Sequence, residues 1–461
     1  MTSKRKIHFE VSERKILLRV CDLIFVLATL HVLRYFFEFD YFEISTTNSR
    51  WTIVLSLYLL FFGSVFELYN LQVASNQFQM LKSVVLTALT TTSIYLLTPV
   101  LTPVLPLNRI QIILFFGGIF FPLLFWRLFY QRFLASQRFE KRALLICNDE
   151  DCTTLVSTLQ EINPHYKVVA VFLLDGTPKT AYNTSISANS SIVDFALSNA
   201  ISEIVIATVH TQELTPTLFK QIMVLLDKGF SIKDYTHVYE SSTYRIPMQH
   251  FNTDFYRYFP FSRSNSNQLY LVLVRTMEVV LSSIGLLITL VLIPLVLIGN
   301  FLGNKGSLLY RQTRVGKNGK PFEIYKFRTM KPDAERHGAV FSTKNDVRIT
   351  PFGNFLRRTR IDELPQFYNI LIGDMALIGP RPERPFFVQK LAAVMPFYET
   401  RHAVKPGLTG WAQVNYSYGT SLDESLIKLQ YDLYYIKRRS IFLDLSIIIK
   451  TCSTILFYRG Q

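Results

Sequence analysis

Two adjacent carboxylates, Asp362 and Glu363, stand in the segment RRTRIDELPQFYNIL, close behind Arg357. Arg381 follows in the segment GPRPERP, where prolines restrict the backbone on both sides. Arginine forks bind phosphate oxygens bidentately, and a carboxylate can bind Mg²⁺ or attack phosphorus. The residue types therefore predict phosphoryl chemistry on an anionic substrate.

Helix capping is the alternative explanation for these carboxylates. Thr359 with Asp362 fits a capping box, and Pro365 suits the first turn of a helix. A cap uses one carboxylate, however, and neighbouring side chains on a helix point in different directions, which leaves Glu363 free. Because cations surround both acids in the sequence, we expect both pKa values to be lowered.

The elements before the carboxylates must present them to the substrate. The basic stretch LLYRQTRVGKNGKPFEIYKFRTM contains Lys326 and Arg328, and its GKNGK turn separates two strand-like runs. Before it, no charged residue occurs between Glu278 and Lys305, and Pro294 lies near the middle of this tract. Basic residues flank both ends, which favours a helix-break-helix that enters the membrane and returns on the same side. The alternative is a kinked helix that spans.

Composition indicates that the rest of the chain contains membrane segments. Of 461 residues, 49% are hydrophobic, and a net charge of +15 accompanies a positive mean hydropathy. This favours membrane segments with basic flanks and anionic partners over a nucleic-acid binder. The four cysteines lie in no metal-ligand spacing and predict free thiols.

Four apolar tracts fill the first third and approach the length of membrane helices. They are Ile16 to Phe37, Trp51 to Phe66, Ser83 to Leu107 and Ile110 to Phe133. Asp22, His31 and Arg34 interrupt the first, and we interpret them as helix ends or inward-facing polar contacts. Basic flanks on both sides of this four-helix unit predict that both ends are cytoplasmic.

A small α/β domain with a parallel sheet is predicted from about Lys141 to Asp254, where short apolar runs alternate with segments that can be helical. The turn after its first strand reads CNDEDCTT instead of GxGxxG. Without glycines the backbone cannot approach a pyrophosphate, which favours a structural or regulatory role over nucleotide binding. The last apolar segment, which Asp444 and Lys450 interrupt, is expected to lie on the membrane or pack on the preceding domain.

Three long motifs occur in order: YKFRTM, IDELPQFYNILIGDMALIGPRPE and KPGLTGWAQVN. Together they resemble the bacterial sugar transferase family, the monotopic phosphoglycosyl transferases. The four-helix N-terminus and the glycine-poor Rossmann-like domain resemble its large polyprenyl-phosphate hexose-1-phosphate transferases.

The resemblance implies transfer of a sugar 1-phosphate, with glucose as first choice and galactose next, from a UDP-sugar to undecaprenyl phosphate, releasing UMP. Asp362 would be the nucleophile and Mg²⁺ ligand, and Glu363 an acid/base or positioning neighbour. Lys326, Arg357, Arg381 and, more weakly, Arg328 would bind phosphates. Pro294 would mark the break of a re-entrant helix, although Ile293 replaces the serine that often precedes it in the family.

The implied domains are a four-helix transmembrane domain (1–138), a Rossmann-like domain (139–255), a linker with the re-entrant hairpin (256–304) and a catalytic α/β domain with interfacial helices (305–461). The implied setting is the bacterial inner membrane, with the other domains on the cytoplasmic side, downstream glycosyltransferases as partners and a homodimer through the Rossmann-like domain. The alternatives are a polysaccharide export component and a nucleotide-sensing Rossmann-like domain. The loop Tyr416 to Ser421 lacks the arginine that some members have, and His337 and His402 are interpreted as surface or packing residues.

Overall fold

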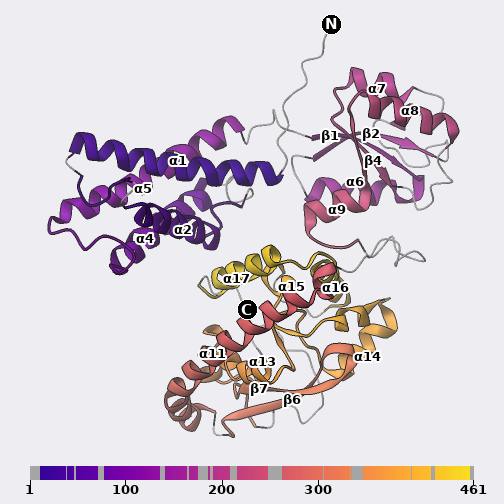
Figure 1. The fold of residues 1–461 in the computed structure, drawn as a ribbon. Helices are drawn as coiled ribbons and strands as arrows, with labels where there is room; N and C mark the ends of the chain where they lie inside the picture. Colours follow the sequence, from indigo (N-terminus) through magenta and orange to yellow (C-terminus); the bar gives the residue numbers. More distant parts are fainter. Residues whose placement is uncertain are drawn as a thin grey trace. The chain divides into compact units, whose positions relative to one another are not determined.

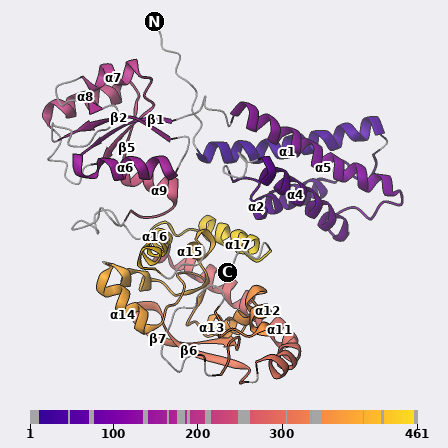
Figure 2. The ribbon, with the colours of Figure 1, turned by 180° about the vertical axis from the view of Figure 1, so that it is seen from behind.

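The computed structural model shows two compact units, Met1–Val238 and Tyr239–Gln461, each with its own hydrophobic cores (Figure 1 and Figure 2). The described residues are 11–37, 39–45, 48–70, 77–134, 141–162, 166–174, 185–186, 191–207, 215–247, 262–304, 306–332, 334, 346–395, 397–416 and 421–456. The predicted domain boundaries at 138 and 255 lie outside these residues.

Helices form at all four predicted apolar tracts of the first unit. They are α1 (Val11–Phe37), α2 (Ser49–Val65), α4 (Gln77–Leu97) and α5 (Arg109–Phe129), which the π-helical turn Tyr130–Leu134 extends. By length and composition α1, α4 and α5 can cross a membrane, whereas α2 has 17 residues, the lower end of the usual range. The third tract was predicted wrongly at its end: α4 stops at Leu97, because Pro99 disfavours a helical Thr98.

Aromatic packing and a buried ion pair help to hold these helices together. Tyr95 and Phe115 are fully buried, with ring centroids 5.1 Å apart. Arg127 of α5 donates from Nη2 to Asp22 Oδ2 of α1 at 2.7 Å, and both side chains are fully buried. The polar contact predicted for Asp22 therefore faces inward, as expected.

The predicted parallel sheet is confirmed. Its strands are β1 (Lys141–Cys147), β2 (Tyr166–Leu173), β3 (Ser185–Ile186), β4 (Glu203–Ala207) and β5 (Ser231–Asp234), in the order β3-β2-β1-β4-β5. The helices are α6 (Asp149–Ile162), α7 (Ile192–Ser198), α8 (Pro216–Asp227) and α9 (Tyr235–Thr243). Figure 1 shows α7 and α8 on one face and α6 on the other, the arrangement of a Rossmann-like domain.

The second unit begins within α9 and is built around a long helix and two small sheets. After a 3₁₀ turn (Arg263–Asn265), its first elements are α11 (Gln268–Gly303), β6 (Leu309–Val315), a 3₁₀ turn (Lys317–Gly319), β7 (Pro321–Phe327), α12 (Pro351–Arg358), a 3₁₀ turn η7 (Ile361–Glu363) and α13 (Gln366–Ile372). They are followed by β8 (Ala376–Ile378), α14 (Pro385–Val394), a 3₁₀ helix η8 (Tyr398–Ala403), β9 (Gly407–Thr409), α15 (Trp411–Asn415), α16 (Leu422–Arg438) and α17 (Ile441–Leu456). The antiparallel pair β6–β7 confirms the predicted hairpin.

The tract around Pro294 is one continuous helix, α11, and not two helices separated by a break. It has 36 residues and is the fourth membrane-crossing candidate by length and composition among the described residues. Proline inside a membrane helix costs one backbone bond, which neighbouring groups can compensate. The proline alone therefore does not distinguish a re-entrant from a spanning α11.

The glycines of α11 are contact points as well as weak helix formers. A Cβ at Gly285 would lie 2.5 Å from the ring of Phe367 in α13, and one at Gly299 would lie 2.2 Å from the ring of Phe352 in α12. The two helices that flank the predicted carboxylates therefore pack directly on the α11 backbone. The last helix, α17, also packs on this unit as expected, with Ile447 fully buried.

Candidate active site

The Asp-Glu pair occupies η7, the single 3₁₀ turn between α12 and α13. Arg360 precedes it with φ 58°, in the left-handed region, so that the chain turns sharply before the pair. Asp362 and Glu363 are 7% and 8% exposed. The capping alternative is wrong: Thr359 ends α12 and donates its hydroxyl to the carbonyl of Phe355, and no side chain caps α13.

Glu363 gathers three cations that come from separate parts of the unit. Its Oε1 accepts from Lys326 Nζ of β7 at 3.1 Å and from Arg381 Nη2, after β8, at 2.8 Å. Arg360 Nη1 lies 3.7 Å from its Oε2. Burial alone would raise the pKa of Glu363, but these cations hold it well below its ordinary value.

Asp362 behaves differently from its neighbour, and the expected lowering of its pKa was wrong. Burial, reinforced by the charge of Glu363, raises the pKa of Asp362 to about 6 despite Lys326 and Arg357. Its Oδ1 is buried and accepts no hydrogen bond from the described residues. A buried carboxylate oxygen without a partner is costly, and it is open to a cation or to an electrophile.

The other predicted phosphate-binding residues divide into two groups. Arg357 donates from Nε to Thr329 Oγ1 at 3.0 Å, and its charge is among those that act on Asp362. Arg328 instead donates to the carbonyl and hydroxyl of Ser307, at 3.0 and 2.6 Å, and lies over the ring of Tyr310. The structure thus brings Lys326, Arg357 and Arg381 to the carboxylates but directs Arg328 elsewhere.

Pro294 lies on an exposed side of α11, while Val296 is buried against Phe327 of β7 and Leu356 of α12. The predicted break residue therefore sits on the helix that supports the site, and its own ring takes no part in the site's polar contacts.

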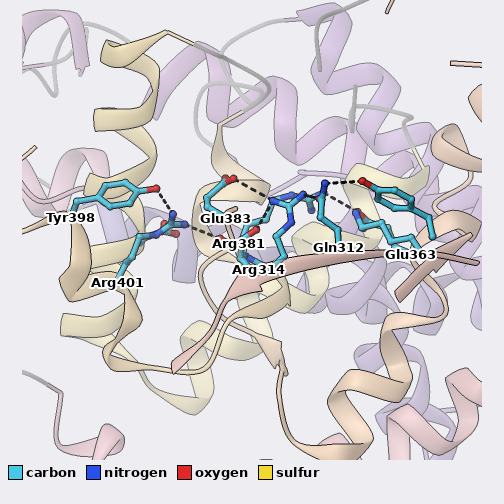
Figure 3. Close-up of polar contacts among 11 residues, drawn as sticks. Gln312, Arg314, Glu363, Arg381, Glu383, Tyr398 and Arg401 are labelled. Carbon is cyan, nitrogen blue, oxygen red and sulfur yellow. Dashed lines mark hydrogen bonds and ion pairs between the residues drawn. The ribbon is translucent and has the colours of Figure 1, made fainter. Parts of the chain in front are cut away.

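A row of polar contacts beside the pair was missed at the sequence level. Arg314 Nη1 donates to the Pro382 carbonyl at 3.0 Å and lies 3.4 Å from Glu383 Oε2, and its Nη2 donates to Gln312 Oε1 at 2.5 Å (Figure 3). Tyr310, paired with Lys326 in the hairpin, accepts from Gln312. The polar residues at alternate positions of LYRQTRV were a usable signal, because such positions share one face of a strand.

The motif with Arg381 is held by the motif KPGLTG. Gly379 N donates to the Thr409 carbonyl and Gly407 N to the Pro380 carbonyl, both at 2.9 Å. A Cβ at Gly407 would lie 2.1 Å from Gly379 N, so that only glycine permits this approach. Two motifs far apart in the sequence are therefore one structural feature that fixes Arg381.

Among the described residues no three His, Cys, Asp or Glu side chains cluster as metal ligands. His402 is half-buried, and burial lowers its pKa to about 4, consistent with a packing role. His337 and most of the loop from Tyr416 to Ser421 lie outside the described residues.

Comparison with known proteins identifies the family to which this part of the chain belongs. The model of a family described as "Bacterial sugar transferase" matches residues 269–458. A protein of Bacillus subtilis (strain 168), provisionally named an undecaprenyl-phosphate N-acetylgalactosaminyl 1-phosphate transferase, is 49% identical over 141 residues, 31% of this chain and 79% of its own length. The chain belongs to the bacterial sugar transferase family.

Two longer relatives match over the same part. The UDP-N-acetylgalactosamine-undecaprenyl-phosphate N-acetylgalactosaminephosphotransferase of Aeromonas hydrophila is 50% identical over 155 residues, 34% of this chain and 37% of its own. The UDP-glucose:undecaprenyl-phosphate glucose-1-phosphate transferase of Escherichia coli (strain K12) is 38% identical over 182 residues, 39% of each chain. The match thus spans about two fifths of these relatives, and both are named as transferases of a sugar phosphate to undecaprenyl phosphate.

Proposed function

We propose that this bacterial sugar transferase moves a sugar 1-phosphate from a UDP-sugar to undecaprenyl phosphate and releases UMP. The observation that carries the proposal is the buried Asp362 carboxylate, with one unpartnered oxygen, beside a Glu363 held by three cations. Cations in excess of carboxylates suit a substrate that brings its own negative charge.

The chemistry follows from the two carboxylates. Asp362 attacks the phosphorus that carries the sugar, the bond to the UMP oxygen breaks, and a covalent aspartyl phosphosugar forms. An oxygen of undecaprenyl phosphate then attacks the same phosphorus, which restores the Asp362 carboxylate and yields the lipid diphosphate sugar. Lys326, Arg357 and Arg381 stabilise charge on the phosphoryl oxygens, while Glu363 keeps Lys326 and Arg381 in place.

Mg²⁺ is part of the proposal. The fit rests on the free Oδ1 of Asp362, because Mg²⁺ commonly takes one or two carboxylates and completes its shell with substrate phosphates and water. When bound, Mg²⁺ would neutralise diphosphate charge next to Asp362. Chelation should therefore stop UMP release, and added Mg²⁺ should restore it.

The contacts of α11 support a re-entrant position in the membrane. Near its start, Glu278 Oε1 accepts from Leu377 N at 3.2 Å, and at its end Asn304 Nδ2 donates to the Arg328 carbonyl at 2.7 Å. Between them Gly285 meets Phe367. A spanning helix would pull the α12–α13 site into hydrocarbon, so we propose that α11 kinks at Pro294 and enters and leaves the same, cytoplasmic, face. An extracytoplasmic signal from a reporter at the C-terminus would refute this placement.

Glucose, N-acetylgalactosamine and galactose are the candidate donor sugars, since relatives are named for each of them. Glucose is the donor expected from the large architecture, and relatives named for UDP-glucose are 38% identical in Escherichia coli and 43% in Xanthomonas campestris. The 50% identity to the Aeromonas hydrophila enzyme favours UDP-N-acetylgalactosamine over this part of the chain. We extend the proposal to an inner-membrane enzyme that begins exopolysaccharide or capsule synthesis and hands its product to other glycosyltransferases.

The decisive experiment incubates purified protein with Mg²⁺, undecaprenyl phosphate and a panel of UDP-sugars, and measures UMP release. We expect release with one donor, and a loss of at least about 10³-fold in Asp362→Asn, because the nucleophile is removed. Intact-mass analysis with donor alone should show a phosphosugar adduct on the parent and none on the variant. Equal UMP release from both proteins would refute the role of Asp362.

A further inference from the structure

A buried arginine outside the cation cluster reaches the main chain of Arg381. Arg401 of η8 is 6% exposed, and its Nη2 donates to the Arg381 carbonyl at 2.9 Å and to Asp432 Oδ2 of α16 at 2.8 Å. Its Nη1 donates to the Tyr398 hydroxyl at 2.7 Å. In Figure 3, Tyr398 and Arg401 lie at one end of the polar row and Glu363 at the other.

The residue after Arg381 explains why this contact matters. Pro382 has no N–H, so the peptide between Arg381 and Pro382 can be held by a hydrogen bond only through its carbonyl. The preceding peptides are already fixed, because Pro380 and Gly379 bond to Gly407 and Thr409. Arg401 therefore supplies the hydrogen bond at the one peptide that directly follows the Arg381 side chain.

The guanidinium suits this task better than an ammonium. Its planar fork offers donors in fixed directions, so one group can serve the Arg381 carbonyl, Asp432 and Tyr398 together. The charge is balanced within the cluster by Asp432, which is 2% exposed. Arg401 has Asp432 as its own counter-charge, whereas Lys326 shares Glu363 with two other cations.

We propose that Arg401 is a positioning residue for the transfer reaction, which fixes the Arg381 backbone so that the Arg381 guanidinium meets Glu363 and the substrate phosphate. The inference rests on the proposed function. Displacing a phosphate-binding group by a fraction of its own size lowers the rate steeply, because catalysis depends on alignment.

The competing explanation is that Arg401 only stabilises the fold, and a pair of substitutions separates the two. Arg401→Met with Asp432→Leu removes both charges and replaces a buried ion pair by apolar side chains, which often preserves stability. Tyr398→Phe is the matched control, because it removes a hydrogen bond from the same guanidinium and leaves the Arg381 carbonyl contact intact.

We expect the Arg401→Met/Asp432→Leu protein to have a thermal unfolding midpoint close to that of the parent. Its kcat/KM for UMP release should nevertheless fall about 10–100-fold. Tyr398→Phe should stay within about twofold of the parent. Arg401→Lys keeps the charge but not the planar fork, so it should lower kcat/KM when it is made in the parent. In a protein that already carries Arg381→Ala, the same substitution should lower kcat/KM little further, because Arg401 acts through the Arg381 guanidinium.

Parent-like kcat/KM in a stably folded Arg401→Met/Asp432→Leu protein would overturn the inference alone, as would equal losses from Arg401→Lys with and without Arg381→Ala. No UMP release from the parent with any UDP-sugar would instead overturn the proposed function and this inference with it.

Discussion

Two buried ionic clusters of the chain use the same kinds of side chain but differ in balance. In the membrane helices, one carboxylate meets one guanidinium: Asp22 and Arg127 are 2.7 Å apart, and both side chains are fully buried. In the second unit, Glu363 by itself has three cationic partners, and the charge of Arg357 acts on the neighbouring Asp362. The charges of the first cluster balance, whereas the second cluster has more cations than carboxylates.

This difference separates a structural pair from the phosphate-binding site that we propose. A balanced buried pair neutralises its own charge, and removing one partner leaves the other charge buried alone. Cations in excess of carboxylates repel one another, and a bound anion relieves this repulsion. The excess therefore favours phosphate binding. The comparison can be tested by breaking each cluster and asking whether stability or activity responds.

The largest expected effect is on the stability of the membrane helices. Asp22→Asn leaves the Arg127 charge buried without its counter-charge, which should destabilise the fold by about 3–5 kcal/mol. The midpoint of thermal unfolding in detergent should fall clearly, measured by size-exclusion chromatography after heating.

The double variant Asp22→Leu/Arg127→Met is the control, because it removes both charges and should recover most of the lost stability. UMP release per folded molecule should remain close to the parent in both proteins. A parent-like midpoint for Asp22→Asn would show that the pair is not the structural contact described here.

The next effect is on catalysis. Lys326→Met keeps the aliphatic stem but removes a cation from Glu363 and from the substrate phosphates, so kcat/KM should fall about 10²–10³-fold. Arg328→Met is the matched control from the same strand end, because Arg328 contacts Ser307 and should change kcat/KM by less than about threefold. Comparable losses in the two variants would place Arg328 in the site and contradict the geometry.

Much of this site could be predicted because its motifs are local. The run from Arg357 to Glu363 and the proline-bounded Arg381 already indicated phosphate chemistry, and three motifs in order indicated the family. The four N-terminal helices followed from the length of the apolar tracts, and the parallel sheet followed from short apolar runs that alternate with segments that can be helical.

The rest depended on long-range packing. The raised pKa of Asp362 depends on how deeply the 3₁₀ turn is buried, which no spacing reveals. Arg401 and Asp432 carry no motif, and Arg401 meets both Asp432 and the Arg381 carbonyl only because η8 packs on α16. The break at Pro294 was expected because proline disrupts isolated helices. The helix α11 nevertheless continues past Pro294, and Val296 packs against Phe327 and Leu356.

The smallest expected effect compares two glycines within apolar helices, Gly285 of α11 and Gly117 of α5, which the sequence alone does not distinguish. Gly285→Ala would place a Cβ 2.5 Å from the Phe367 ring, and overpacking of this kind costs about 1–3 kcal/mol, less the helix propensity that alanine gains. Because Phe367 follows the carboxylates on α13, UMP release should fall as well. Thermal midpoint and kcat/KM are the two measurements.

Gly117→Ala in α5 is the control, because its Cβ would meet Phe121 at 3.5 Å, an ordinary contact. Alanine there should stabilise the helix by up to about 1 kcal/mol and leave UMP release unchanged. Gly285→Ala/Phe367→Leu should regain part of the lost midpoint, since the smaller side chain makes room. If Gly285→Ala instead behaves like Gly117→Ala, α13 is free to shift on α11, and the close packing of this helix does not hold the carboxylates in place.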